Sequence, residues 1–325
     1  YWRDWSSDVC SSDLFVAEPP VVSRSTTTNV VAINGRPRSS KIGCQGALLT
    51  GAKYDQAMTR AYFWQYSVVM SVQGAPAGYL EDFYAAGSGA NKSIGILLVH
   101  GFTGSPASMR PWAHFLNQRG YTVRVPLIPG HGTQWQDLNK VKWQEWPAKA
   151  QSELEKLLAE CSRVFIFGLS MGGGNTLHVA AKNNDRIKGI VLVNPMIHIP
   201  EFAIKFVDII KHLSASRPSV GDDIKKPGVT EWGYDALPTK GVAQLHRFLK
   251  ATRKMLGSIT VPALVFHSVE DHILKVSNTE IIMNEIGSLD KQRIELANSY
   301  HVATLDYDAE TIFENSRQFI EKLRK

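Results

Sequence analysis

The sequence contains few cysteines, no long apolar run and no dense block of basic residues. Three cysteines among 325 residues cannot form a disulfide framework, which favours a reduced, intracellular protein. No stretch of roughly 18 or more residues is apolar throughout, so no transmembrane segment is predicted. Lysine and arginine are scattered and give a formal net charge of +6, which argues against a nucleic acid partner. We therefore expect a cytoplasmic protein that is a monomer or a weak homodimer.

The first 75 residues differ in composition from the rest of the chain. Ser6-Ser7-Asp8 and Ser11-Ser12-Asp13 repeat without helical or strand periodicity, and residues 1–14 resemble a translated cloning adapter. Residues 15–40 are rich in Pro, Ser, Thr and Arg and show little apolar patterning. We expect residues 1–75 to be a non-native or disordered leader and residues 76–325 to form the folded domain.

The rest of the chain alternates between short apolar runs and amphipathic segments. The apolar runs predict strands at 94–99, 121–126, 164–167, 187–193, 261–267 and 293–296. Apolar residues at helical spacing predict helices at 106–119, 143–161, 175–182, 279–286 and 310–323. Ser105 and Pro106 are typical of a helix start at the first of these. The alternation predicts an α/β fold with a doubly wound, mostly parallel sheet.

One long segment, residues 195–258, interrupts this alternation and contains no clear strand. Its first part carries apolar residues at helical spacing, a polar stretch follows from 218 to 238, and residues 241–255 predict a further helix. The apolar residues of the first part are Phe202, Phe206, Ile209 and Ile210. We expect a small helical cap over the carboxyl edge of the sheet, where ligands bind in such folds. Ordinary crossover helices are the alternative.

The motif Gly168-Leu169-Ser170-Met171-Gly172 lies between an apolar strand and a helix. It is the G-x-S-x-G pattern of a nucleophile elbow. A serine on a strained strand-to-helix turn leaves little room for neighbouring Cβ atoms, so Gly168 and Gly172 let the chain pack. The turn raises the Ser170 hydroxyl above the sheet, and the helix directs its N-terminal dipole at the site. A glycine-rich turn without chemistry is the alternative.

A serine nucleophile needs a base that takes its proton and a carboxylate that orients the base. After a nucleophile elbow, the acid and then the histidine follow in the chain. Two predicted strand ends downstream of Ser170 offer these groups. Glu270 and Asp271 follow the first of these strands, and His301 follows the second. The chain order therefore makes His301 the candidate base.

Two other histidines, His267 and His272, lie at the end of the same strand as the candidate acids. One loop could not easily carry both the acid and the base, so His301 is preferred over both. The residues alone do not separate Glu270 from Asp271, because a shift of one residue decides which carboxylate turns inward. Both stay open at this point.

Acyl transfer also requires hydrogen-bond donors for a tetrahedral oxyanion. The backbone N–H of Met171, the residue after the serine, is one candidate. The backbone N–H of Phe102 is the other, because the turn His100-Gly101-Phe102 follows the first strong strand. A simple strand-ending turn is the alternative. Since no dinucleotide motif, P-loop lysine or zinc-binding spacing is present, we expect cofactor-free hydrolysis and no metal site.

From about residue 76 onward, the chain resembles the small bacterial carboxylesterases and monoacylglycerol lipases of the α/β-hydrolase superfamily. The matching segments are His100-Gly101-Phe102-Thr103-Gly104, Pro129-Gly130-His131-Gly132, Gly168-Leu169-Ser170-Met171-Gly172-Gly173, Glu270-Asp271 and His301-Val302-Ala303-Thr304-Leu305-Asp306. The resemblance implies an α/β-hydrolase fold with a small helical cap inserted before the penultimate core strand. It also implies that Asp271 is the orienting acid.

The activity that this resemblance implies is that of a serine carboxylic-ester hydrolase. Its substrates would be short- to medium-chain acyl esters or monoacylglycerols, cleaved through an acyl-enzyme intermediate without a cofactor. The only expected partner is a small-molecule ester. Two alternatives share the same residues, namely a non-catalytic ligand-binding protein of this fold and a thioesterase or amidase with the same triad.

Overall fold

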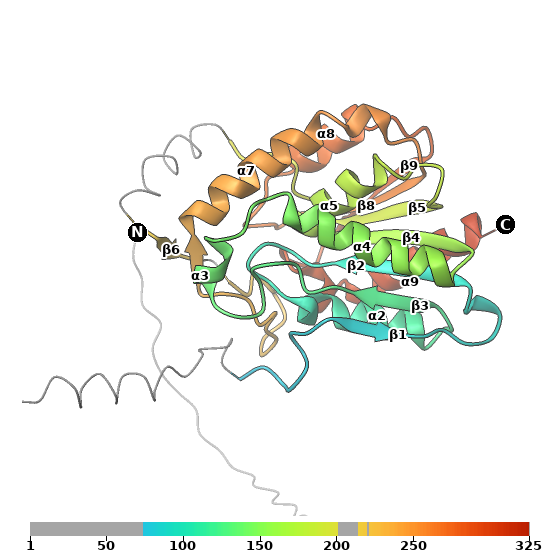
Figure 1. Ribbon diagram of the computed structural model, residues 1–325, viewed down its shortest axis with the longest axis horizontal. Coiled ribbons are helices and arrows are strands. Elements are labelled where there is room, and N and C mark those ends of the chain that lie inside the picture. The colour runs from blue at the N-terminus through green and yellow to red at the C-terminus, as the bar shows by residue number, and fades with distance from the viewer. Residues whose placement is uncertain (1–73, 201–213, 220, 325) are drawn as a thin grey trace, which may run out of the picture. The chain divides into compact units, whose positions relative to one another are not determined.

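A seven-stranded β-sheet forms the centre of the described part of the protein (Figure 1). The computed structural model describes residues 74–200, 214–219 and 221–324, all of which belong to one unit of residues 56–325. The leader expected over residues 1–75 lies almost wholly outside the described residues, so its nature stays a prediction.

The strands of this sheet lie in the order β1-β3-β2-β4-β5-β8-β9, and all neighbours are parallel except β1 and β3. The bounds are β1 Phe83–Ala85, β2 Ile94–Val99, β3 Thr122–Val125, β4 Arg163–Leu169, β5 Gly189–Val193, β8 Ala263–Ser268 and β9 Lys291–Leu296. The mostly parallel sheet is therefore confirmed, and its parallel strands lie where the apolar runs predict them. Strand β1 is not predicted, because its three residues are too few for a recognisable strand pattern and none of them is fully buried at the antiparallel edge.

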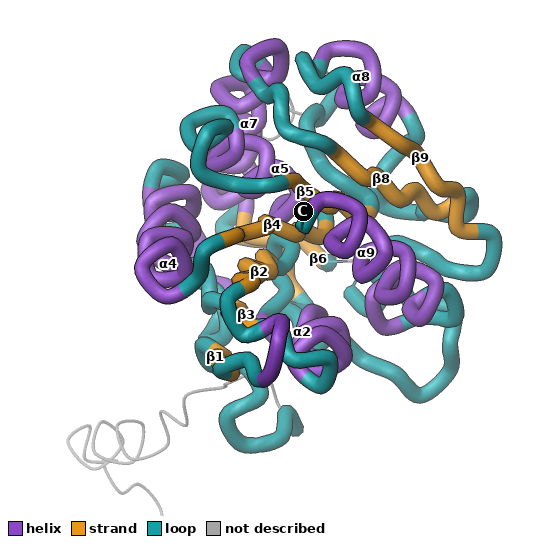
Figure 2. The backbone as a smooth tube through the Cα atoms, turned by 90° about the vertical axis from the view of Figure 1, so that its right-hand side faces the viewer, coloured by secondary structure: helices purple, strands orange, loops and turns teal. Residues whose placement is uncertain are grey.

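Alternate side chains of the central strands enter two separate helical layers, as the period of a strand requires. In β2, Leu97 and Val99 point to one layer, whereas Ile96 and Leu98 point to the other. The first layer contains α4 Glu145–Glu160, α5 Met171–Ala180, α7 Thr239–Arg253 and α8 Ser277–Glu285, and the second contains α2 Arg110–Asn117 and α9 Ala309–Leu323. Figure 2 shows the sheet between these layers. Because both faces are covered, the central strands β2, β4, β5 and β8 consist mostly of apolar residues.

The shorter helical elements lie in the connections between strands and helices. They are η1 Gly89–Asn91, η2 Pro106–Met109, α3 Trp135–Leu138, η3 Leu256–Ser258 and η4 Ala303–Leu305. Ser105 begins η2 as the sequence predicts, because its side chain accepts a hydrogen bond from the N–H of Ala107 at 3.3 Å and Pro106 follows it.

After β3 the chain crosses to the other side of β2 and continues with β4. The switch in strand order therefore lies between the adjacent strands β2 and β4. Strand β3 lies on one side of β2, whereas β4, β5, β8 and β9 follow in order on the other side. Ligand sites in open parallel sheets form at such a switch point, outside the carboxyl ends of the strands. In the register of these two strands Val99 lies opposite Gly168, so the turn after β2 adjoins the turn that carries Ser170.

The insertion between β5 and β8 differs in part from expectation. It contains two short strands, β6 Ser216–Pro218 and β7 Ala236–Pro238, which pair antiparallel, where the sequence predicts no strand. These strands were not recognisable because each has three residues, ends in proline and lacks an apolar alternation. Helix α7 agrees with the helix predicted at 241–255. The helix expected around Phe202 to Ile210 lies outside the described residues, and the cap itself stays a prediction.

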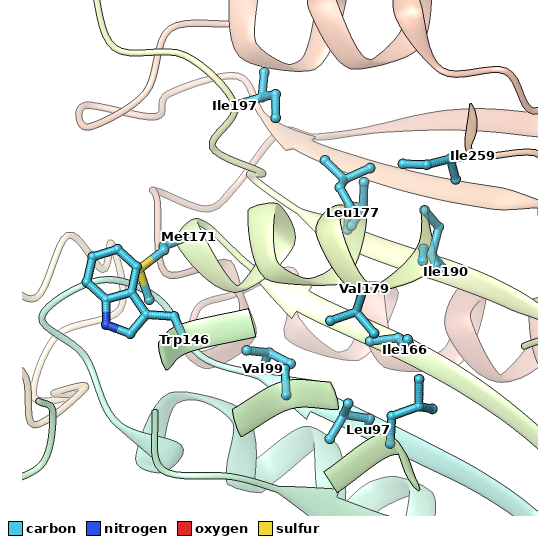
Figure 3. Packing of buried hydrophobic residues seen from close by; sticks show 14 of the residues in the cluster. Leu97, Val99, Trp146, Ile166, Met171, Leu177, Val179, Ile190, Ile197 and Ile259 are labelled. Atoms are coloured by element: carbon cyan, nitrogen blue, oxygen red, sulfur yellow. The ribbon is translucent and has the colours of Figure 1, made fainter. Parts of the chain in front are cut away.

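The core between the sheet and the first helical layer is tightly packed. Figure 3 shows Leu97 and Ile166, which lie opposite each other on adjacent strands, on the face that also holds Leu177 and Val179 of α5. Each of the two strand side chains is fully buried. Removing methylene groups here leaves a cavity that the neighbouring strands cannot close.

We therefore predict that Leu97→Ala lowers the free energy of unfolding by about 2–5 kcal/mol, because the substitution loses both transfer free energy and packing. Leu289→Ala is the matched control, since Leu289 is 100% exposed and its substitution should change stability by less than about 0.5 kcal/mol. Urea unfolding followed by circular dichroism measures both. Equal effects of the two substitutions would contradict the packing described for β2.

Candidate active site

Ser170 occupies a strained turn between β4 and α5. Its backbone angles are φ 57° and ψ −120°, in the region that non-glycine residues rarely adopt. A Cβ on Gly168 would overlap the Gly172 carbonyl, and a Cβ on Gly172 would overlap the Val99 carbonyl of the neighbouring strand. Both glycines of the motif are therefore required by packing.

Helix α5 begins at Met171, four residues earlier than the helix that the sequence predicts from Asn175. The intervening glycines have low helix propensity, which hides this first turn from a sequence reading. They are needed for close packing, because a Cβ on Gly173 would lie 2.9 Å from Pro195 Cβ, and a Cβ on Gly174 would lie 3.0 Å from the Met196 carbonyl oxygen. The early start places the N-terminus of α5 directly after Ser170.

Asp271 and His301 lie together in the loops after β8 and β9. His301 Nδ1 is 2.8 Å from Asp271 Oδ2, and both side chains are almost fully buried. The other carboxylate oxygen, Oδ1, accepts hydrogen bonds from the N–H groups of Ile273 at 2.9 Å and Leu274 at 2.7 Å. With both oxygens engaged, the carboxylate is fixed and the histidine ring is oriented by it.

The competing residues have other partners. Glu270 is exposed and its carboxylate lies 3.0 Å from Lys225 Nζ. His267 Nδ1 lies 3.2 Å from Thr279 Oγ1. His272, the other candidate base, pairs with Asp223 and is considered below. Of the two carboxylates that the sequence leaves open, the structure therefore brings Asp271 to His301.

Ser170 and His301 line the same cavity, which has a volume of about 520 Å³. Gly101 and Phe102 line it as well, and a Cβ on Gly101 would lie only 3.2 Å from Ser170 Cβ. Within the described part of the chain, neither the Phe102 N–H nor the Met171 N–H donates a hydrogen bond to another protein group. Both N–H groups are thus unpaired in the described part of the protein.

Electrostatics at the site favour an ionised acid next to a basic imidazole. Burial by itself lowers the pKa of His301, but the charge and hydrogen bond of Asp271, with smaller effects from Glu231 and Asp223, raise that pKa above its ordinary value. Burial by itself raises the pKa of Asp271, but His301 and the two N–H donors lower it below its ordinary value. The carboxylate therefore stays ionised and stabilises a protonated His301.

Asn194, at the end of β5, connects the loops of the site and was not identified from the sequence. It is buried with φ 42°, and its Nδ2 donates to the His301 carbonyl at 2.7 Å and to Ser268 Oγ at 2.9 Å. Its Oδ1 accepts from the Ser268 N–H at 2.7 Å. These bonds link β5, the end of β8 and the loop of His301. The available sequence signal is an asparagine directly after an apolar run, because asparagine adopts a positive φ more readily than most non-glycine residues.

His100 fixes the turn that carries Phe102. Its Nε2 accepts a hydrogen bond from the Ile128 N–H at 3.1 Å, so its Nδ1 is the protonated nitrogen and donates to the Gly101 carbonyl at 2.9 Å. Burial lowers the pKa of His100 to about 4, and the ring is neutral at physiological pH. His100 thus packs between the turns after β2 and β3.

Glu231, in the insertion, also lines the cavity and was not found from the sequence. Burial raises the pKa of Glu231 to about 7, although the nearby His301 opposes this change. No motif marks this residue, because it lies within the polar stretch at 218–238, which has no periodicity.

Among residues 74–200, 214–219 and 221–324, no group of three His, Cys, Asp or Glu side chains could hold a metal ion. No helix in this part of the chain is long and apolar enough to cross a membrane.

Comparison with known proteins agrees with this geometry. Residues 91–226 match the family described as serine aminopeptidase, S33. A thermostable monoacylglycerol lipase of Bacillus sp. (strain H-257) is 41% identical over 256 residues, which cover 78% of this chain and 99% of that protein. The chain belongs to the carboxylesterase and monoacylglycerol lipase family of α/β-hydrolases.

Two further relatives of this hydrolase support the assignment. A carboxylesterase of Bacillus subtilis (strain 168) is 28% identical over 236 residues, covering 72% of this chain and 94% of that protein. A solved structure described as LipS and LipT, two metagenome-derived lipolytic enzymes, has a TM-score of 0.70 and 37% identity over 75% of this chain and 98% of that chain. The α/β-hydrolase fold expected from the sequence is therefore confirmed.

The environment of Glu231 predicts a pH-dependent stability. Its folded pKa of about 7 exceeds the ordinary 4.5, so the carboxyl group holds its proton more tightly in the folded state. Stability from this group is therefore present below pH 4.5 and is lost as the pH rises to 7. Glu231→Gln removes the ionisation and should raise the free energy of unfolding by about 1–3 kcal/mol at pH 8, with little change at pH 4.5.

Thermal melts of both proteins at the two pH values measure this effect. Glu270→Gln is the control, since Glu270 is exposed and its ion pair with Lys225 contributes little to stability. A Glu231→Gln protein that is no more stable than the wild type at pH 8 would contradict the described burial.

Proposed function

We propose that this protein is a serine carboxylic-ester hydrolase, with Ser170 as nucleophile, His301 as base and Asp271 as orienting acid. One observation carries the proposal: the strained elbow presents Ser170 to the same cavity that the His301–Asp271 pair lines through its imidazole. A turn with a structural role alone would not need a serine in a strained backbone conformation beside an oriented histidine. The family relationship supports the same assignment.

In the proposed reaction, Ser170 Oγ attacks the ester carbonyl carbon while His301 Nε2 takes the hydroxyl proton. The N–H groups of Phe102 and Met171 bind the oxyanion of the tetrahedral intermediate. His301 then gives its proton to the departing alcohol, which leaves an acyl-enzyme. Water then attacks the acyl carbonyl carbon while His301 takes a proton from it, and His301 gives this proton to Ser170 Oγ as the carbonyl–Oγ bond breaks and the acid leaves.

The cavity supports an ester with an apolar acyl chain as the substrate. Its walls are largely aliphatic, and the aliphatic lining includes Met196, Ile199, Leu237, Val242, Leu245, Ile273 and Leu274. Polar side chains, among them Thr103 and Glu231, also line the cavity and offer hydrogen-bonding groups to the alcohol. A monoacylglycerol joins one apolar chain to a polar alcohol, and relatives are named for this substrate and for simple esters.

A cap function for the insertion, a cytoplasmic location and a monomeric or weakly dimeric state remain predictions from the sequence.

The first test is hydrolysis of p-nitrophenyl butyrate and of monoacylglycerols of increasing chain length. Ser170→Ala should reduce kcat by about 10⁴-fold or more, because no other group can form the acyl-enzyme. An organophosphate should label the wild type on Ser170 and leave the variant unlabelled, as mass spectrometry can measure. Matched thioester and amide substrates separate the esterase from related acyl hydrolases. A wild-type protein that turns over no ester and takes no label would refute the proposal.

The pH dependence follows from the raised pKa of His301. The base must be neutral to accept the proton of Ser170, so kcat/KM falls as the pH drops through the pKa of His301. Because this pKa lies above the ordinary 6.5, the midpoint of the acid limb should also lie above pH 6.5. Initial rates in a pH-stat measure the profile. A midpoint well below 6.5 would contradict the role of Asp271 beside the base.

A further inference from the structure

Asp223 is a buried carboxylate from the insertion that binds the loop of His301. Its Oδ2 accepts hydrogen bonds from the backbone N–H of His301 at 3.1 Å and from that of His272 at 3.3 Å. Its Oδ1 lies 2.8 Å from His272 Nδ1. Its own carbonyl accepts a hydrogen bond from the Val302 N–H at 3.1 Å. One residue thus contacts the loop of the proposed acid and the loop of the proposed base.

A second carboxylate connects the same two segments in the opposite direction, since it follows the His301 loop and binds the insertion. Asp306, in the core, accepts hydrogen bonds from the insertion at the N–H of Lys225 (2.7 Å) and of Lys226 (3.0 Å), and from Tyr300 N–H at 2.9 Å. The segment of the insertion around Asp223 is therefore held against the His301 loop from both sides. These contacts fix the position of Asp223 rather than leaving it on a free surface.

The charge of Asp223 also reaches the imidazole of His301. The charged groups that face this ring are Asp271 from the loop after β8, and Glu231 and Asp223 from the insertion. His272 is the partner on the other side of Asp223, and the hydrogen bond and charge of Asp223 raise the pKa of His272. Asp271 has the larger effect on His301, and Asp223 adds to it.

We propose that Asp223 is a positioning residue for the catalytic base. Its carboxylate holds the backbone of His301 and the loop of His272 in the arrangement that keeps the imidazole on Asp271. The insertion is then part of the catalytic geometry as well as a wall of the cavity. The proposal rests on the proposed function only in naming His301 as the base.

Asp223→Asn tests the proposal, because asparagine keeps the shape and one acceptor oxygen but removes the charge. The imidazolium of His301 then loses a nearby anion, so its titration should move to lower pH by about half a unit. Asp223→Ala also removes the acceptor and leaves two N–H groups unpaired, and kcat should fall by about tenfold or more. Asp223→Glu restores the charge and should return the titration toward that of the wild type.

NMR titration of the His301 ring nitrogens reports its protonation without any substrate, and the acid limb of kcat/KM with a p-nitrophenyl ester is the second readout. Asp235→Asn is the matched control, since Asp235 is an exposed carboxylate of the same insertion. Equal His301 titrations in the wild type, Asp223→Asn and Asp235→Asn would overturn the proposal. A shift confined to Asp223→Asn would support it even if the wild type hydrolyses no ester, in which case only the proposed function fails.

Asp223→Asn and Asp223→Ala must keep the wild-type circular dichroism spectrum for this comparison. Should Asp223→Ala unfold, the titration of Asp223→Asn alone decides the outcome. A purely structural role would lower kcat at every pH without moving the titration of His301, and that result would also overturn the proposal.

Discussion

The close approach of β2 and β4 at their carboxyl ends is the constraint on which the site depends. Val99 lies opposite Gly168, and the backbone at Gly172 packs directly against the Val99 carbonyl. The same approach brings Gly101 onto Ser170. A side chain at Gly172 would overlap the Val99 carbonyl and separate the two strand ends, and with them the turns of Ser170 and Phe102. Packing in the sheet therefore requires the glycines of the motif, and the same glycines determine where Ser170 lies.

Features set by neighbouring residues could be predicted from the sequence. Fully buried parallel strands must be apolar on both faces, so each of them left a visible run, and the elbow left a motif at Ser170. Helix α5 was placed too late, because propensity counts against glycine while packing requires it. Strands β1, β6 and β7 were missed, because three residues bury too little to leave a pattern.

Features set by distant residues could not be predicted in the same way. The choice of Asp271 over Glu270 came from the family resemblance, and in the structure it follows from which side of the loop faces the sheet. Asn194, Asp223 and Glu231 carry no motif, because each acts through partners far away in the chain that only the folded backbone brings near. The roles of such buried polar groups depend on the residues that surround them in the folded structure, and the adjacent residues in the sequence do not reveal them.

The position of β5 has a consequence for how activity responds to substitution. The turns of Ser170 and Phe102 leave the sheet at β4 and β2, whereas those of Asp271 and His301 leave it at β8 and β9, so β5 and Asn194 separate the two pairs. The distance between the hydroxyl and the imidazole is then governed by the local twist of three adjacent strands. A change in the packing of β5 would therefore move the hydroxyl and the imidazole relative to each other, even when every residue that lines the cavity is kept.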